Sequence, residues 1–421
     1  MSSCDLITGS NKWQQLDFAV EPQNDTSAVI TVKDVKPPMP DTHTAANGTS
    51  SILLPTLIMS AKNFLIFSIL FYLPLYFAGL GFSGLQIGFL LSLFAITSLF
   101  SSFLVGFLSD RLPARYLSSC SFVLLIICFI SLSMLQHFWT MAALLFIGGL
   151  GNNIADISMT SFVLKVSDRR EGGKRLGAFN GLKTLAAGLG ALSGGLLVAQ
   201  LSFQKVFFLL GCAFFLPILL TLPVKKIATF SYALGHYRGD LWKKEILFFL
   251  MLIFVFTLHW GAEGTSYSLL LKERFSLTQR SIALYMGSIW ILYALFIYGV
   301  SRIIKESTPL HWIIYPGLLL SGTGHILFTY PSLPLSYLFR LVHECGDAAF
   351  EMYLMVGMHR YFPLERLGST SGVVLTVTLA GRLLGSLIFG PMGEHFGYHY
   401  PFILSGILTL LCLPLVWIGR R

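Results

Sequence analysis

The sequence predicts an all-α membrane protein whose twelve transmembrane helices form two pseudo-symmetric bundles of six. Three observations carry this prediction: the composition, the spacing of the apolar runs and an internal repeat. Hydrophobic residues make up 54% of the 421 residues, charged residues only 12%, and the mean hydropathy is +0.72. Soluble domains carry roughly 25% charged residues, so most of this surface must face lipid. The composition excludes a soluble enzyme, a nucleic-acid module and a disordered scaffold.

Apolar runs of roughly 20–28 residues repeat from residue 51 onward, and each is long enough to cross the hydrocarbon core of a bilayer. We expect helices near 52–78, 84–108, 116–136, 138–166, 174–199, 204–223, 246–271, 280–304, 309–330, 334–361, 367–390 and 398–419.

Four regions follow from this pattern. Residues 1–50 are polar, contain the stretch "KPPMP" and are expected to form a disordered cytoplasmic tail. Residues 51–223 form the first six-helix bundle and 246–421 the second. The connection 224–245 is the longest between spans, is rich in Lys and Arg, and is interpreted as a cytoplasmic linker.

The distribution of Lys and Arg sets the expected orientation. If the tail is inside, the inner connections and the C-terminus hold 18 basic residues, whereas the outer connections hold 4. Cytoplasmic loops of membrane proteins carry this excess, and it accounts for the net charge of +9 without nucleic acid. Both termini are therefore predicted to be cytoplasmic. The membrane itself, a bacterial inner membrane or a eukaryotic plasma or organelle membrane, stays open.

The two halves contain related segments. A shift of 191 residues places "RLGAFNGLKTLAAGLGALSG", which begins at Arg175, on "RLGSTSGVVLTVTLAGRLLG", which begins at Arg366. Seven of the twenty positions are identical, five of them Gly or Arg, and the same shift places Asp156 on Asp347. Internal repeats are typical of secondary transporters, whose binding site lies near the midplane between the repeats. Coincidence among Gly-rich helices is the alternative.

The connection after the second span resembles a motif of the major facilitator superfamily, G-x-L-x-D-R-x-G-R-R/K. The matching residues are Gly106, Leu108, Asp110, Arg111 and Arg115, whereas Pro113 replaces a Gly. This resemblance extends over 51–421 and implies the major facilitator fold. It also implies that the latch residues Gly106, Asp110, Arg111 and Arg115 help to hold the two halves together on the cytoplasmic side. Span eight keeps Gly299, Arg302 and Lys305 but has no acid, so we expect a degraded second latch. Span one and the chain from span ten onward look most similar to the branch that contains oligosaccharide and nucleoside proton symporters.

Ionisable residues inside the spans are the candidates for function, because a charge in the hydrocarbon region costs at least about 2.5–3.5 kcal/mol. In the superfamily, helices 1, 4, 7 and 10 line the central cavity, and most deep charges here lie on those four spans. Carboxylates and histidines suit proton transfer. We expect proton coupling at Glu344, Asp347, Glu263, His343 and Glu351. We expect the substrate cavity to contain Lys62, Asp156, Asn152, His259, Trp260 and Arg340.

These residues also have structural explanations. Lys62 with Asp156, and Arg340 with Glu344, could be static ion pairs. The histidines could be satisfied packing residues, and a packed Trp260 is more common than one that stacks on a ligand.

The function predicted from these residues is secondary active transport of a small polar organic solute, coupled to protons, by alternating access. A proton-driven exporter is the first alternative. It is disfavoured because Ala191 stands where exporters of the superfamily carry a Pro in span five. A transporter-like receptor or assembly factor that moves nothing is the second.

An enzyme is not expected, since no nucleophile–base set or metal site is visible in the sequence. We expect no cofactor and no metal. The expected partners are the solute, protons and the lipid bilayer, with no nucleic acid, and the expected state is a monomer.

Overall fold

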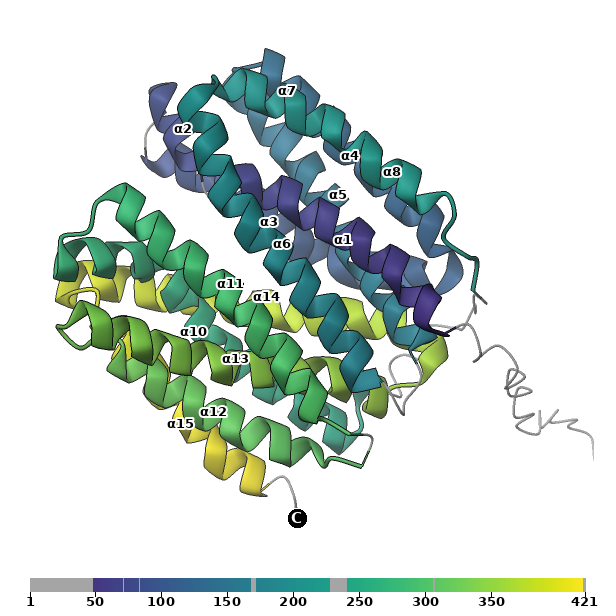
Figure 1. Ribbon diagram of the computed structural model, residues 1–421, viewed down its shortest axis with the longest axis vertical. Helices are drawn as coiled ribbons and strands as arrows, with labels where there is room; N and C mark the ends of the chain where they lie inside the picture. The colour runs from purple at the N-terminus through teal and green to yellow at the C-terminus, as the bar shows by residue number, and fades with distance from the viewer. Residues whose placement is uncertain are drawn as a thin grey trace, which may run out of the picture. The chain divides into compact units, whose positions relative to one another are not determined.

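The computed structural model describes residues 48–70, 72–82, 84–167, 172–227, 241–305 and 307–418, and all the helices labelled in Figure 1 belong to one compact unit. The predicted tail lies outside the described residues except for 48–50, where α1 begins. Most of the predicted linker 224–245 also lies outside them.

Helices occupy all twelve predicted spans. The first half contains α1 (Gly48–Leu70), α2 (Leu73–Gly79), α3 (Gly84–Arg111), α4 (Ala114–Met134), α5 (Phe138–Val166), α6 (Gly172–Gln200), α7 (Phe203–Ala213) and α8 (Phe215–Thr221). The second half contains α10 (Lys244–Phe275), α11 (Gln279–Ile303), α12 (Leu310–Leu327), α13 (Leu333–Tyr361), α14 (Leu367–Phe396) and α15 (Tyr400–Ile418). No strand occurs within the described ranges.

Two predicted spans are interrupted. Span one is divided between α1 and α2, and span six between α7 and α8. The second break has a local cause: Pro217 has no N–H to donate to the carbonyl of Ala213, so the helix stops and restarts at Phe214.

Ten helical segments in the described part of the chain are long and apolar enough to cross a membrane. The other two predicted spans are α12 and α13, which carry many polar side chains of the site described below. Large apolar side chains point outward along the segments, including Phe100 at 79% exposure and Leu387 at 65%. A soluble surface would not carry so many, so these faces are suited to lipid.

The helices pack in the same order in both halves. In the first half α1 packs on α6, α4 on α5 and on α7, and α3 on α5. In the second half the corresponding pairs are α10 with α14, α12 with α13 and with α15, and α11 with α13. Figure 1 shows the purple-to-teal helices of the first half and the green-to-yellow helices of the second. The halves meet along two corresponding seams, α3 with α14 and α6 with α11.

The repeated glycines explain why the repeat survives in the sequence. A Cβ on Gly194 would lie 1.8 Å from the carbonyl oxygen of Ser68 in α1. A Cβ on Gly385, its counterpart at the shift of 191, would lie 2.0 Å from the carbonyl oxygen of Leu258 in α10. Both glycines therefore let the first and fifth spans of a half approach until backbone meets backbone. This shared packing role makes coincidence a poor explanation of the sequence match.

Candidate functional site

The halves are joined at one end of the molecule by the carboxylate of Asp110, the next-to-last residue of α3. It is fully buried and accepts hydrogen bonds from the backbone N–H of Gly368 at 2.8 Å and of Ser369 at 2.9 Å. The Ser369 hydroxyl donates at 2.6 Å, and Lys165 Nζ lies 2.9 Å away. Gly368 and Ser369 belong to the first turn of α14, whose N–H groups have no partner within the helix. An acid at a helix N-terminus is also favoured by the helix dipole.

The other latch residues lie around Asp110. A Cβ on Gly106 would lie 2.4 Å from the carbonyl oxygen of Gly368, so this glycine permits the close crossing of α3 and α14. The Arg111 guanidinium stacks on the Phe107 ring, with its carbon 3.4 Å from the ring centroid, and Arg115 stacks on Tyr116. We call the end of the molecule that contains Asp110 the latch end.

The corresponding seam lacks the acid, and the helix start differs as well. The shift of 191 places Asp110 on Ser301 and Gly368 on Gly177, and these two residues are again in contact: a Cβ on Gly177 would lie 2.1 Å from Ser301 Oγ. However, α6 begins at Gly172, five residues before Gly177, whereas α14 begins one residue before Gly368. The N–H groups at Gly177 therefore already have intrahelical partners, and an acid at Ser301 would find no free donor there.

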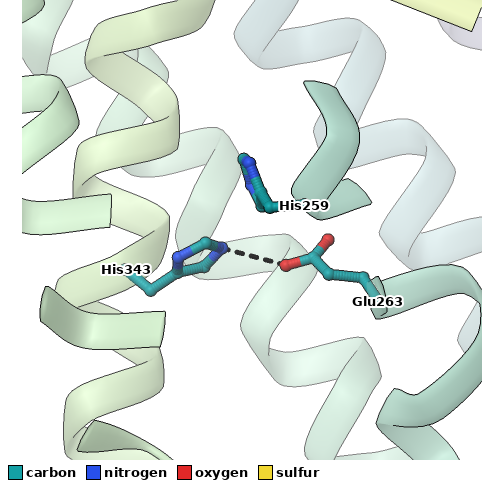
Figure 2. Close-up of side chains that lie close together, drawn as sticks. All are labelled: His259, Glu263 and His343. Carbon is teal, nitrogen blue, oxygen red and sulfur yellow. Dashed lines mark hydrogen bonds and ion pairs between the residues drawn. The ribbon is translucent and has the colours of Figure 1, made fainter. Parts of the chain in front are cut away.

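The second half contains a cluster of ionisable side chains from α10, α12 and α13. Figure 2 shows His259 and Glu263, one turn apart on α10, with His343 of α13 pointing toward them. The Nε2 atom of His343 lies 2.9 Å from Glu263 Oε1. Arg340, one turn before Glu344 on α13, forms ion pairs with Glu263 and with Glu344, each at 2.6 Å. Arg340, Glu344 and Asp347 stand four and three residues apart in the sequence, so they lie on one face of α13.

Asp347 contacts three polar side chains of its own half. Trp260 Nε1 donates to Asp347 Oδ2 at 2.8 Å, and the hydroxyl of Ser321 donates to Oδ1 at 2.6 Å. His259 Nε2 lies 3.2 Å from Oδ2. The carboxylate is 4% exposed, so in this conformation Asp347 is enclosed by the second half.

The first half contains a smaller polar group. Lys62 of α1 is 2% exposed, and its Nζ lies 2.9 Å from both carboxylate oxygens of Asp156 and 2.8 Å from the Asn152 side-chain oxygen. Asn152 also donates to Asp156 at 3.1 Å. The Asp156 side chain is 30% exposed. Lys62, Asp156 and Asn152 therefore belong together, whereas Asp156 and Asp347 each find their partners within their own half.

Three predicted site residues lie apart from the rest of the groups to which they were assigned. Glu351 is half-buried one turn beyond Asp347, and its electrostatic neighbours are Lys183 of α6 and Asp347. Trp260 was assigned to the substrate cavity, with packing as the more common role of a Trp, and its indole N–H donates to Asp347. His259, assigned to the same cavity, likewise lies beside Asp347.

Several residues of the site are absent from the sequence-based set. Lys165, which pairs with Asp110, is one of them. His359 of α13 lies 2.9 Å, through Nε2, from the carbonyl oxygen of Ser167, which caps α5, and thus adds a second contact between the halves at the latch end. His325 of α12 is 1% exposed, and neither ring nitrogen has a hydrogen-bond partner. A histidine within an apolar span is itself a signal for a functional residue, whereas Ser321 gives no such signal.

The cluster also has the residue types of a metal site. Ligand atoms of His259, Glu263 and His343 lie within 4.8 Å of one another. The guanidinium of Arg340, 2.6 Å from Glu263, already neutralises one of these ligands and would repel a metal ion.

Two pseudo-symmetric helical halves, joined at one end and lined with buried charges, define a membrane transporter of the alternating-access class. The family model of the Major Facilitator Superfamily matches residues 53–314 and 250–421. The chain belongs to this superfamily and is a multi-pass membrane transporter.

Individual relatives are distant. The quinolone resistance protein NorA of Staphylococcus aureus is 25% identical over 330 residues, which cover 76% of this chain and 84% of NorA. The human organic anion transporter MFSD10 (TETRAN) has a TM-score of 0.72 at 16% identity and covers 88% of this chain and 99% of its own. The proton:xylose symporter XylE, bound to 6-bromo-6-deoxy-D-glucose, has a TM-score of 0.70 at 13% identity and covers 88% and 96%. At these identities the structures establish a common fold.

Proposed function

We propose that this protein is a proton-coupled secondary transporter of a small polar organic solute. The observation that carries the proposal is the buried cluster on α10, α12 and α13, in which His343 faces Glu263 and His259 faces Asp347. An imidazole gains and loses a proton near neutral pH, and a carboxylate beside it can exchange that proton with it. A change in their protonation alters the balance of charge at the centre of one half, which is the kind of event that drives alternating access.

The proposed roles follow the contacts. Glu263, His343, Asp347 and Glu344 take part in proton transfer, together with Glu351, which lies toward Lys183 and the first half. Arg340 neutralises the two glutamates. Asp156 offers its exposed edge to the solute, and Lys62 and Asn152 hold that carboxylate in place.

The latch end is proposed to face the cytoplasm, and both termini with it. The excess of Lys and Arg in the connections at this end supports this orientation. Asp110 would then keep the cytoplasmic side closed while the opposite side admits solute.

Export coupled to proton entry is the second candidate. It is favoured by the 25% identity to NorA, whose name records resistance to quinolones. Ala191, in place of the Pro of span-five exporter motifs, favours uptake.

The test begins with the purified full chain in detergent. A panel of sugars including D-xylose, organic anions and the quinolone norfloxacin is screened by thermal shift, because a solute at about a hundred times its Kd stabilises the fold by about 2.7 kcal/mol. The stabilising solute is then offered to proteoliposomes with an imposed pH gradient.

We expect the wild type to accumulate the solute and Asp347→Asn to lose the accumulation that the gradient drives. Glu273→Gln, which changes an exposed acid at the end of α10, is the matched control and should behave as wild type. Undiminished accumulation by Asp347→Asn would remove the basis of the coupling assignment.

A further inference from the structure

The tautomers of His259 and His343 are fixed by the backbone. The Nδ1 atom of His343 lies 2.9 Å from the carbonyl oxygen of Ser321, and the Nδ1 atom of His259 lies 2.6 Å from the carbonyl oxygen of Phe256. A carbonyl oxygen can only accept a hydrogen bond. Each ring must therefore carry a proton on Nδ1.

The opposite nitrogen of each ring faces a carboxylate. Nε2 of His343 lies 2.9 Å from Glu263, and Nε2 of His259 lies 3.2 Å from Asp347. If both partners lacked a proton, two lone pairs would face each other in a buried site. Each contact therefore needs one proton of its own, in addition to the proton on Nδ1.

The remaining contacts indicate which atom carries that proton. Asp347 already accepts from Trp260 and Ser321, and Glu263 is paired with the Arg340 guanidinium. Donors and a cation stabilise the ionised form of a carboxylate. The protons accordingly reside on the imidazoles, and both rings are imidazolium cations.

The charges of the cluster then cancel. The two imidazolium rings and Arg340 supply three positive charges. The carboxylates of Glu263, Glu344 and Asp347 supply three negative charges. The other groups facing the two rings or these carboxylates are His325 of α12, Glu351 of α13, Arg382 of α14, and Tyr267, Tyr285 and Tyr293 of α10 and α11.

We propose that the second half stores two exchangeable protons at once, one on His343 against Glu263 and one on His259 against Asp347, and that each transport cycle moves both. His259 is thereby a second proton carrier and Trp260 its positioning residue. The ring centroids of His259 and His343 are 5.3 Å apart, and His325 lies 4.5 Å from the His343 ring and 5.1 Å from the His259 ring. The two protonation sites are therefore close enough for the charge on one ring to affect proton binding by the other. The number of protons moved per cycle rests on the proposed function, whereas their storage does not.

Storage is tested without any solute. The full chain, labelled with ¹⁵N-histidine and reconstituted in lipid, is studied by solid-state NMR as a function of pH. His259→Gln and His343→Gln assign these two rings among the ten histidines, and His395→Gln, which changes an exposed ring, is the control. We expect two buried rings with both nitrogens protonated at neutral pH and below, each converting to the Nδ1–H tautomer at alkaline pH. A single doubly protonated ring, or an Nε2 that is bound to a metal ion, would overturn the proposal.

The number of protons moved per transport cycle is tested in proteoliposomes with the solute found by thermal shift. Proton flux and solute flux are measured together. The wild type should move two protons per solute, and His259→Gln one. One proton per solute in the wild type would overturn the inference even if NMR finds two charged rings. Solute flux with no proton flux would instead refute the proposed function and leave the NMR result standing.

Discussion

Removal of the Asp110 carboxylate should open the latch end. Asp110→Ala deletes three hydrogen bonds that cross between the halves: two from the first turn of α14 and one from the Ser369 hydroxyl. The ion pair between Lys165 and Asp110 lies within the first half. It is kept when the halves separate, so it does not contribute to the free-energy difference between the closed and open conformations. Hydrogen bonds to a charged acceptor contribute about 1.5–3 kcal/mol each.

The free-energy difference between the closed and open conformations of the latch end is expected to change by about 4 kcal/mol. This value is just below the smallest sum of the three contributions, about 4.5 kcal/mol, because the three donors belong to two adjacent residues and their contributions are not fully additive. About 4 kcal/mol corresponds to almost three decades in an equilibrium constant. A closed-to-open ratio of about 99:1 would fall to about 1:10. Ser369→Ala removes one donor and should shift the equilibrium by about 1.5–2 kcal/mol, or roughly tenfold to thirtyfold.

Distances between spin labels measure this shift. Tyr116 and Lys305 are exposed at the latch end of the first and second halves, and both can carry a label in a background without the native cysteines. Asp110→Ala should move most of the distance distribution to longer values, and Ser369→Ala a smaller part. Ser109→Ala is the matched control, because its buried hydroxyl has no hydrogen-bond partner in the described structure. A folded Asp110→Ala protein with the wild-type distribution would refute the reasoning.

Three further predictions concern stability, measured as the thermal midpoint in detergent. Ser301→Asp should lower the thermal midpoint instead of building a second latch, because it buries a charge where α6 offers no free N–H. A higher midpoint would show that the seam between α6 and α11 can accept an acid. Gly346→Ala should lower the stability of the fold by about 1–3 kcal/mol through overpacking, since its Cβ would lie 2.1 Å from the backbone nitrogen of Ser321. Gly299→Ala is the control, because a Cβ there meets open space and should leave stability unchanged or higher. Equal midpoints for the two variants would contradict this reasoning. Lys62→Met should destabilise by leaving a half-exposed acid unpaired, and Lys62→Met with Asp156→Asn should recover most of the loss if the pair is structural. Failure of the double variant to recover would indicate that the pair is more than a static ion pair.

Periodicity and hydropathy predicted the fold because lipid leaves few alternatives. Each apolar run had to become a helix, since a membrane span must satisfy its own backbone groups. The helix bounds differ from the prediction by a few residues at most ends, as α13 illustrates with Leu333–Tyr361 against 334–361. The exceptions are local: α14 continues through Pro391 to Phe396, beyond the predicted end at 390, and two spans are broken. The sequence gives only weak signals for such local adjustments.

The candidate site was only partly predictable. Helical spacing placed Arg340, Glu344 and Asp347 on one face of α13, and a deep charge needs a partner. The partners themselves depend on how α10 and α12 pack against that face, which one sequence does not encode in a visible pattern. Trp260 is an example: its indole N–H could bind a ligand or a carboxylate, and only the packing of α10 on α13 brings Asp347 within 2.8 Å. The latch was predictable from its motif, and the loss of the second latch from the missing acid, whereas the lack of free N–H donors at Gly177 became visible only from the start of α6.

The movement of protons with solute tests the central claim most directly. A pH-sensitive dye is enclosed in proteoliposomes, and the solute identified by thermal shift is added outside with no imposed gradient. Proton movement that begins with the solute is expected for the wild type and its absence for Asp347→Asn, with acidification of the interior indicating symport and alkalinisation indicating exchange. Solute entry that leaves the internal pH unchanged in the wild type would contradict the account.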